Sequence, residues 1–291
     1  MNKHAYLIMA HKQPELLKKL ISLLDNEKHD FFIHIDKKSN LDYDDIKNAA
    51  HKSNINFIER ISVNWGGFSQ IECELNLLKS AISGRYSYYH LLSGFDLPLK
   101  SSDEIYDFFE NSNNKEFLSF DNENISNQIL ERITLYYLLQ EKINRKNYLF
   151  YVLDKISILF QKIFKVNRLK NSNLKIQKGA NWFDITHKFA LYILSKEDEI
   201  YSMYKNTFCA DEIFLQTLMV NSKFIDNLYH KKFDDDSHAI MRYIDWKRGK
   251  PYVFRKEDYN DLIKSDFLFA RKFDEDIDKI IIDNIYDYLL R

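Results

Sequence analysis

Small and polar residues follow three apolar segments that have the composition of buried strands. Ala10 and His11 follow the first segment, Asp36 follows the second, and Asp96 lies shortly after a later one. In an open parallel sheet, ligands bind outside the carboxyl ends of the strands. A small residue lets a nucleotide approach the backbone, and a carboxylate can accept hydrogen bonds from ribose hydroxyls. We therefore expect these residues on one nucleotide-binding edge, with the alternative that they are ordinary turn formers.

Phosphate groups on that edge would need positive charge nearby. The sequence contains neither the Gly-rich dinucleotide fingerprint nor a Walker A loop, which excludes the commonest oxidoreductase and nucleoside-triphosphatase patterns. A metal held by paired acids would be one solution. Acidic pairs separated by one residue occur at Asp42/Asp44, Asp234/Asp236, Asp274/Asp276 and Asp276/Asp278. None directly follows an apolar strand, so we interpret them as solvated surface and expect no metal site.

Direct contact from cations is the other solution. Arg271 and Lys272 lie between Phe269 and Phe273. Charges flanked by aromatic residues are suited to a diphosphate at the edge of a core. An amphipathic strand without a ligand would give the same pattern, and both interpretations stay open at this point.

Proton transfer to or from a hydroxyl requires a carboxylate or an imidazole. Glu212 begins a segment, Glu212–Met219, with helical spacing, and is a candidate general base. The alternative is that it only complements the helix dipole. Trp182 and Trp246 adjoin polar residues in loop-like segments and could stack on sugar rings, although large aromatic residues are more often part of a core.

The elements that would position these residues alternate along the first half of the chain. Buried strands are expected at His4–Ala10, Phe31–Ile35, Ile55–Ile58 and Tyr86–Leu92. Pro14 opens one helix between them, and the spacing of Ser69 and Glu72 predicts a capping box that opens another. Strands joined through helices form right-handed crossovers. We therefore expect an α/β fold with a mostly parallel central sheet and helices on both faces, in a single domain over residues 1–291.

Residues 142–178 differ in composition from the rest of the chain. They include ten Lys or Arg and one acid, Asp154. From Leu149 to Phe164 the apolar residues recur at i, i+3 and i+4, which predicts a basic, amphipathic helical insertion. The apolar side of this helix, between Tyr148 and Val166, would either pack on the sheet or lie on an anionic membrane. The aromatic and basic residues of this segment favour binding to the membrane.

The overall composition narrows the class of protein. The 42 Lys and Arg balance 43 Asp and Glu, so a nucleic-acid partner is not expected. Two cysteines, Cys73 and Cys209, give neither a disulfide framework nor a zinc pattern, which suits a reducing cytoplasm. The first apolar run is too short for a secretory signal, and no run reaches the roughly 18 apolar residues of a membrane span. We expect a cytoplasmic protein, peripheral on the inner face of the membrane.

Seven segments, taken in order, resemble one enzyme family. They are AYLIMAHKQPELLKKL, FFIHIDKKS, WGGFS, YSYYHLLSGFDLPLKS, KGANWF, ADEIFLQTL and LFARKFDE. The chain resembles the core 2 and I-branching N-acetylglucosaminyltransferases and the peptide O-xylosyltransferases, which form family 14 of the glycosyltransferases. The resemblance covers almost the whole chain from His4 to Asp274, apart from the basic helix. It implies a GT-A (Rossmann-like) fold, a UDP-sugar donor, inversion to a β-linkage, and no metal or other cofactor.

The resemblance also implies roles for individual residues. Glu212 in ADEIFLQTL is similar to the catalytic base, and Arg271 and Lys272 to cations that replace a metal at the diphosphate. The other implied contacts are Ala10, His11, Asp36 and Asp96 with the UDP donor, and Trp182 and Trp246 with the acceptor. Gly67 and Ser69 belong to a family motif for which a structural role is one possibility.

The animal enzymes of this family carry many disulfides and a membrane anchor, whereas this chain has two cysteines. It resembles a bacterial member that builds capsule, lipopolysaccharide or exopolysaccharide on a glycan or lipid-linked glycan acceptor. The expected donor is UDP-GlcNAc, with UDP-xylose and UDP-galactose as alternatives. Two other interpretations are an inactive sugar- or nucleotide-binding module and a metal-dependent transferase that uses Asp42 and Asp44.

Overall fold

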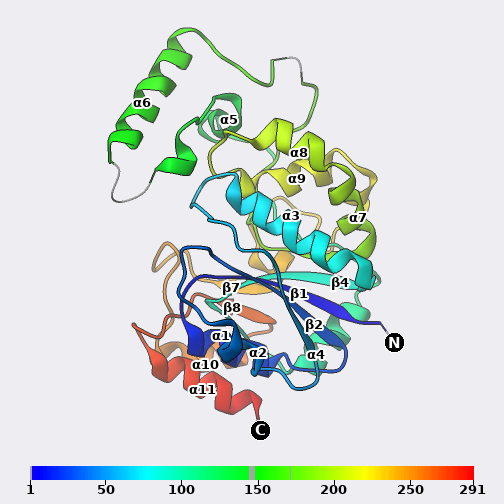
Figure 1. Cartoon of the computed structure of the whole chain (residues 1–291). Coiled ribbons are helices and arrows are strands. Elements are labelled where there is room, and N and C mark those ends of the chain that lie inside the picture. Colours follow the sequence, from blue (N-terminus) through cyan, green and yellow to red (C-terminus); the bar gives the residue numbers. More distant parts are fainter. Residues whose placement is uncertain (1, 144–147, 171) are drawn as a thin grey trace.

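The computed structural model describes residues 2–143, 148–170 and 172–291. Its centre is a five-stranded sheet with the order β3-β2-β1-β4-β6 (Figure 1). The strands are β1 (His4–Ala10), β2 (His29–Ile35), β3 (Asn54–Phe57), β4 (Tyr88–Ser93) and β6 (Asp184–Thr186). The first four are parallel, and β6 pairs antiparallel with β4. The predicted mostly parallel sheet is thereby confirmed.

A second, smaller sheet has the order β5-β8-β7. Its strands are β5 (Asp96–Pro98), β7 (Arg242–Ile244) and β8 (Phe269–Arg271). This sheet was not predicted from the sequence, because each strand has only three residues and shows too few alternations to be recognised. The pattern around Arg271 does belong to a strand, as one of our two interpretations had it.

Helices cover both faces of the central sheet (Figure 1). One face carries α1 (Pro14–Leu23), α2 (Tyr43–Lys47), α4 (Ser102–Glu110), α10 (Tyr259–Lys264) and α11 (Lys279–Leu289). The other carries α3 (Ser69–Ala81), α7 (His187–Ser195), α8 (Glu197–Tyr204) and α9 (Phe214–Val220). Along β1, Ala5 and Leu7 join the core under α3, whereas Tyr6 and Ile8 join the core under α1. This two-residue alternation buries both faces of the strand and confirms the predicted layers.

Two further helices, α5 (Asn127–Thr134) and α6 (Tyr148–Ile163), lie at the periphery, at the opposite end of the molecule from α11 (Figure 1). The predicted amphipathic helix of the basic segment is therefore present. Short 3-10 turns complete the chain: η1 (Ile82–Gly84), η2 (Gln140–Lys142), η3 (Ala210–Glu212), η4 (Lys223–Asn227), η5 (Ser237–Ile240) and η6 (Lys256–Asp258). Among the described residues, no helix combines the length and the apolar character needed to cross a bilayer.

A buried ion pair joins the two sheets. Arg242 in β7 donates to both carboxylate oxygens of Asp184 in β6, at 2.9 and 3.0 Å, and both side chains are almost fully buried. His90 in β4 contacts the same carboxylate at 2.9 Å. This bidentate geometry and the further donations from Arg242 to the Ile240 and Leu91 carbonyls, at 3.0 and 2.8 Å, offset much of the desolvation cost, although Arg242 Nε has no partner among the described residues. This pair therefore fixes the smaller sheet, and with it Arg271, against the larger one.

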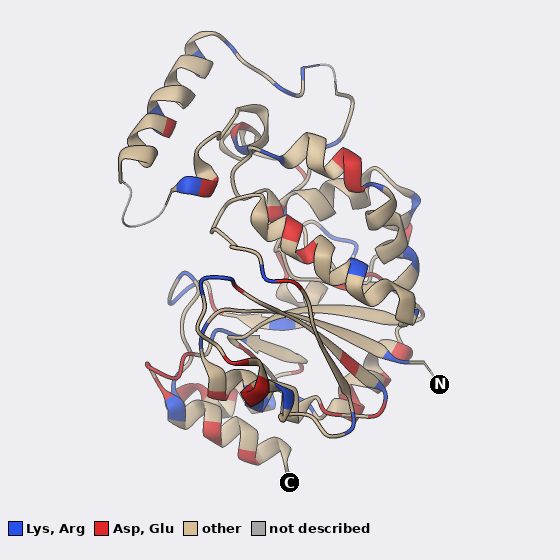
Figure 2. Ribbon diagram, in the orientation of Figure 1, with Lys and Arg blue, Asp and Glu red and all other residues tan. Residues whose placement is uncertain are grey.

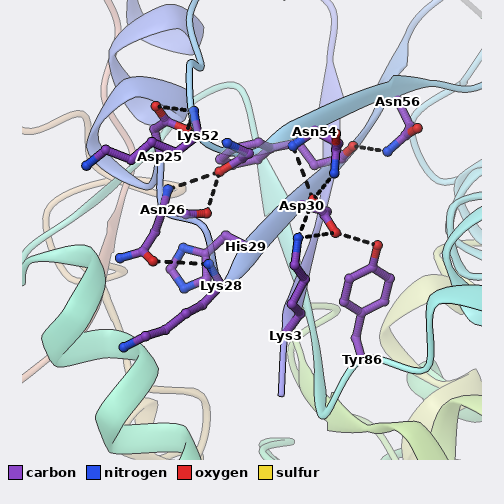
Figure 3. Close-up of polar contacts among 12 residues, drawn as sticks. Lys3, Asp25, Asn26, Lys28, His29, Asp30, Lys52, Asn54, Asn56 and Tyr86 are labelled. Atoms are coloured by element: carbon purple, nitrogen blue, oxygen red, sulfur yellow. Dashed lines mark hydrogen bonds and ion pairs between the residues drawn. The ribbon is translucent and has the colours of Figure 1, made fainter. Parts of the chain in front are cut away.

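Another polar cluster closes the amino-terminal end of the sheet (Figure 3). Asp30 accepts hydrogen bonds from Asn54 Nδ2 at 2.8 Å, from the Tyr86 hydroxyl at 2.9 Å and from Lys3 Nζ at 3.3 Å. These contacts tie the start of β2 to β3 and to the segment before β4. Because they lie at the opposite end from the strand carboxyl termini, we assign them to the fold and not to the site.

Two local predictions from the sequence are wrong. Ser69 does not cap α3: the N-cap residue is Phe68, and the Ser69 hydroxyl instead accepts from the Asn64 amide at 2.8 Å and donates to Glu141 at 2.9 Å. The helix predicted from Glu212 begins later, at Phe214. Since Glu212 ends the 3-10 turn η3 before that helix, complementing the dipole of α9 is a weaker explanation for this carboxylate.

Candidate active site

The carboxyl ends of β1, β2 and β4 meet at one edge. The Asp36 amide donates to the Ala10 carbonyl at 2.9 Å, and the Gly94 amide donates to the Met9 carbonyl at 3.0 Å. His11 follows Ala10 and packs against Phe95, with ring centroids 5.2 Å apart. The structure therefore brings Ala10, His11, Asp36 and the segment that leads to Asp96 to a common edge, as the strand pattern predicted.

The carboxylate of Asp36 stabilises this edge from within. One oxygen accepts from the Lys38 amide at 2.7 Å, and the other accepts from the Val63 amide at 3.1 Å. The ammonium group of Lys38 lies 3.7 Å from the second oxygen. Asp36 thus joins the loop after β2 to the loop after β3, and its contact with a nucleotide stays a prediction.

Arg271 is held in place from several sides. Its Nη1 donates to Asp96 Oδ1 at 2.8 Å and also contacts the Ser93 hydroxyl. The guanidinium group stacks over the ring of Trp182, 4.4 Å from the ring centroid. Asp96 is completely buried, and its other oxygen accepts from the Ser93 amide at 2.8 Å. Asp96 therefore orients Arg271, and the direct donor contact predicted for Asp96 has no support from its position.

Lys272 extends the positive charge beside Arg271. Its ammonium group lies 4.6 Å from the centroid of Phe95, the residue that also packs against His11. Burial, followed by the charge of Arg271, lowers the pKa of Lys272. Two adjacent cations that repel each other are stabilised by an anion placed between them. A diphosphate at this edge would supply that charge.

Glu212 is the acidic counterpart of these cations. Its Oε2 accepts a hydrogen bond from Arg132 Nη1 at 2.8 Å and lies 3.5 Å from Lys178 Nζ. The side chain is 35% exposed. Its Oε1 makes no hydrogen bond within the described ranges, so one oxygen is held and the other remains able to accept a proton from a ligand.

The loop from Lys178 to Trp182 connects the acidic and basic parts of the site. Lys178 contacts Glu212 at one end of the loop, and Trp182 contacts Arg271 at the other. In between, the Gly179 amide donates to the Glu212 carbonyl at 3.0 Å. A Cβ at Gly179 would lie 1.8 Å from the Ser119 carbonyl oxygen, so only glycine allows this approach. The loop therefore fixes Glu212 relative to Arg271.

Asp211, next to Glu212 in sequence, is buried beneath the surface of the site. One of its oxygens accepts from Gln70 Nε2 at 3.2 Å, and the other has no hydrogen-bond partner. Burial, followed by the negative charge of Glu212, raises the pKa of Asp211 to about 7. Glu74 on α3 is also fully buried, and burial together with the charge of Asp211 raises its pKa. Asp211 and Glu74 are thus two buried acids whose pKa values are raised above the ordinary range.

A pocket of about 820 Å³ reaches Arg132, the residue that donates to Glu212, although Glu212 itself does not line it. Aromatic side chains form much of the remaining wall: Trp65, Tyr137, Tyr148, Tyr151 and Phe208. We call this cavity the aromatic pocket. Aromatic faces next to charged groups are a suitable surface for a sugar ring.

The two tryptophans predicted for the acceptor side differ in their surroundings. Trp182 is buried beneath Arg271 and faces Arg242 on another side, with 6.0 Å between the ring centroid and the guanidinium carbon. Trp246 is 57% exposed and follows β7, in which Ile244 pairs with Arg271. Neither lines the aromatic pocket. Their contact with an acceptor stays a prediction.

Three residues of the candidate site were not predicted from the sequence: Arg132, Lys178 and Trp65. Arg132 belongs to a helix without a motif, and only the folded chain brings it to Glu212. Lys178 and Trp65 are the first residues of two quoted segments, KGANWF and WGGFS, so a closer look at the polar and aromatic residues of those motifs could have singled them out. Gly67 and Ser69 of WGGFS pack around Glu141, which supports a structural role for both.

The acidic pairs considered as metal ligands have structural partners. Asp42 caps α2 by accepting from the Asp44 amide at 3.0 Å, and Asp236 and Asp278 cap η5 and α11. Asp274 accepts from the Asp276 amide at 3.0 Å. Within the part of the chain that the structure describes, no group of three or more His, Cys, Asp or Glu side chains is arranged to hold a metal ion.

A mostly parallel, open sheet covered by helices on both faces defines an α/β protein, and folds of this class bind ligands at the carboxyl edge of the sheet. Comparison with known proteins identifies the family: the model described as "Core-2/I-Branching enzyme" matches residues 4–267. The chain belongs to the Core-2/I-Branching enzyme family. This membership and the mostly parallel sheet agree with the GT-A fold that we expected.

Two relatives illustrate the range of the family. Xylosyltransferase 2 of Rattus norvegicus is 24% identical over 307 residues, which cover 98% of this chain and 33% of that protein. The β-1,3-galactosyl-O-glycosyl-glycoprotein β-1,6-N-acetylglucosaminyltransferase of Homo sapiens is 24% identical over 313 residues, 98% of this chain and 69% of that protein. The chain thus spans about one third of the length of the xylosyltransferase. The solved structure of mouse xyloside xylosyltransferase 1 aligns with a TM-score of 0.37 at 9% identity over 93% of this chain and 97% of that chain, too distant to inform function.

Proposed function

We propose that this chain is an inverting glycosyltransferase that moves a sugar from a UDP-sugar to a hydroxyl of a glycan acceptor, in the synthesis of a bacterial surface polysaccharide. Family membership and the names of the two relatives support the class of reaction. The observation that carries the proposal is the environment of Glu212. One carboxylate oxygen is held by Arg132 and Lys178, the other makes no hydrogen bond among the described residues, and Arg132 also lines a pocket suited to a sugar.

In the proposed reaction, Glu212 accepts the proton of the acceptor hydroxyl as that oxygen attacks the anomeric carbon of the donor. The new carbon–oxygen bond forms on the face opposite the leaving group, and the bond from the anomeric carbon to the phosphate oxygen breaks. The electron pair of that bond leaves with UDP. A single displacement of this kind inverts the anomeric centre. Holding the two reactants in line lowers the entropic part of the barrier.

Arg271 and Lys272 would stabilise the negative charge that develops on the departing UDP. Arg271 is oriented in advance by Asp96 and Trp182, so it pays little reorganisation cost in the transition state. Ala10 and His11 would contact the nucleotide from the end of β1. We propose that two cations suffice at the diphosphate and that no metal ion is required.

The acceptor would enter through the aromatic pocket. Trp65 is 76% exposed and makes a T-shaped contact with Phe208, so most of its ring is accessible to a ligand. A sugar ring stacked there would lie on the Arg132 side of Glu212. An exposed Trp246 near Arg271 offers a second surface for a longer glycan.

UDP-GlcNAc is the proposed donor, and UDP-xylose is the second candidate, because similar proteins are named for transfer of each sugar. UDP-galactose remains a third choice. We propose that the protein works in the cytoplasm, at the inner face of the membrane, on a glycan or lipid-linked glycan. An inactive binding module is the competing interpretation.

The release of UDP from a panel of UDP-sugars tests the proposal. Wild-type protein is incubated with UDP-GlcNAc, UDP-xylose or UDP-galactose, alone and with simple aryl glycosides as acceptors. We expect one donor to be consumed faster than the others, and faster still with a suitable glycoside. Tight UDP binding without turnover of any donor or acceptor in the panel would favour the inactive module.

A further inference from the structure

The apolar side of α6 faces away from the protein. Seven large apolar side chains of this helix and the residue after it are between 43% and 76% exposed: Leu149, Leu153, Ile156, Leu159, Phe160, Ile163 and Phe164. They recur at intervals of three and four residues, which places them on one side of an α-helix. An amphipathic helix that packs on its own core buries this side, and α6 leaves it open.

The opposite side of α6 attaches the helix to the protein through polar groups. Asp154 is its one buried residue in the described range, and its carboxylate accepts from the Leu139 amide at 3.3 Å. Seven residues later, Gln161 accepts from the Tyr136 amide at 2.7 Å and donates to the Tyr136 carbonyl at 2.8 Å. Two residues seven apart lie on the same side of an α-helix. The helix is therefore fixed with its apolar side outward.

The charge around this surface is positive. Asp154 is the only acid in α6, and it is buried against the protein. Lys155 and Lys162, seven residues apart, are both exposed along one edge of the apolar side, and Lys165 and Lys170 follow the helix and are exposed as well. Figure 2 shows α6 as a mostly uncharged ribbon at the outer end of the molecule. Its exposed charged groups are all basic.

We propose that α6 docks this protein on an anionic lipid surface, with its apolar side chains in the interface and its lysines against the headgroups. Apolar area and basic charge on one helix are the two features that favour such binding. A two-fold dimer formed through the same surface would bring the lysines of both copies together and is disfavoured by their repulsion. This inference goes beyond the proposed transferase activity and does not require it.

The structure also decides which basic residues to test. Arg168 donates to the backbone carbonyls of Lys205 at 3.1 Å and Ser202 at 3.4 Å, so its replacement would disturb the fold. Lys162 pairs with Glu131 at 2.7 Å. Lys165 and Lys170 are exposed and do not line the aromatic pocket. Changing these two residues to Glu alters the surface charge and leaves the site intact.

Co-sedimentation with vesicles tests the proposal. The full chain is mixed with vesicles of phosphatidylcholine alone or with one third phosphatidylglycerol. We expect binding only with the anionic lipid, and weaker binding as salt rises. The Lys165→Glu/Lys170→Glu variant should bind on the order of tenfold more weakly or worse. The triple variant Leu159→Gln/Phe160→Gln/Ile163→Gln should lose binding, since it removes exposed apolar groups that would enter the interface.

A matched triple variant on α11 and the residues that flank it controls for general loss of surface apolarity. Ile277→Gln/Ile280→Gln/Leu290→Gln replaces side chains that are 45%, 54% and 59% exposed at the other end of the molecule. It should bind vesicles like the wild type. Wild-type protein that stays in the supernatant with anionic vesicles at low salt overturns the proposal, as does equal binding by the α6 triple variant. Concentration-dependent dimerisation lost in that variant, without lipid binding, would assign the surface to a second copy instead.

Discussion

Arg132 donates a hydrogen bond from Nη1 to Oε2 of Glu212 at 2.8 Å, and the same arginine lines the aromatic pocket. The residue that holds the proposed base therefore also borders the cavity proposed for the acceptor. A charge-assisted hydrogen bond to one oxygen fixes the orientation of the carboxylate. The other oxygen is then presented in a defined direction.

Replacing Arg132 by Met should lower the rate of sugar transfer on the order of tenfold or more, because Glu212 loses the donor that orients it. UDP affinity should change little, since Arg132 does not contact Arg271 or Lys272 in the described structure. Steady-state kinetics and UDP titration separate the two effects. Arg132→Lys should restore part of the turnover, and failure of Lys to improve on Met would argue against an orienting charge.

We expect Arg271 and Lys272 to contribute to the affinity for UDP. Arg271→Ala or Lys272→Ala should weaken UDP binding by about 1 to 3 kcal/mol, the range for hydrogen bonds to charged groups. Calorimetric titration with UDP measures this loss, and Lys264→Ala on α10 serves as a control for charge alone. In the same titration, EDTA should leave wild-type affinity and turnover unchanged. Strict dependence on Mn²⁺ would contradict a cation-only diphosphate site.

We expect the two exposed tryptophans, Trp65 and Trp246, to contribute differently to acceptor binding. Trp65→Ala should raise the KM for the acceptor roughly tenfold, because an aromatic face in the proposed pocket is lost, with the donor KM unchanged. Trp246→Ala removes another exposed aromatic side chain, which lies outside the pocket, and should matter only for longer glycans. Kinetics with a monosaccharide and an oligosaccharide acceptor compare the variants. A larger effect of Trp246→Ala on the monosaccharide would place the acceptor elsewhere.

Because Asp211 is buried, we expect the free energy of unfolding to depend on pH. Burial and the charge of Glu212 raise its pKa from 3.8 to about 7 on folding. Between these values the folded chain retains a proton that the unfolded chain has lost, so stability should fall as the pH rises from about 4 to 7. Asp211→Asn removes the ionisable group, and this part of the fall should disappear. Urea unfolding of both proteins across the window measures the difference, and parallel curves would show that Asp211 does not titrate there.

The sequence predicted those parts of the fold that have a clear period. The four parallel strands of the central sheet have four to seven residues each, and the apolar spacing of α1, α3 and α6 is regular, whereas the three-residue strand β6 was not predicted. The smaller sheet was missed, since strands of three residues carry no period. Ser69 and Glu72 have the spacing of a capping box, but the side chain of Glu141, far along the chain, competes successfully for the Ser69 hydroxyl.

The candidate site, like the fold, was predicted only in part from the sequence. Residues after strands were predicted because a parallel sheet brings its carboxyl ends together, and Glu212, Arg271 and Lys272 came from motifs. Arg132 was out of reach, because its contact with Glu212 joins residues 80 positions apart. Asp96 is an acid that follows a strand, which suggested a ligand-binding role. In the fold its carboxylate is buried and accepts from Arg271. Burial of that kind follows from tertiary packing and not from local pattern.

The turnover of Glu212→Gln tests the central claim most directly. The amide has nearly the same shape as the carboxylate but cannot accept the proton of the attacking hydroxyl. With the best donor and acceptor from the UDP-sugar panel, this variant should turn over roughly a hundredfold more slowly or worse than the wild type. Its affinity for UDP should be unchanged within about twofold, which shows that the donor site is intact. Near-normal turnover by Glu212→Gln would contradict the account.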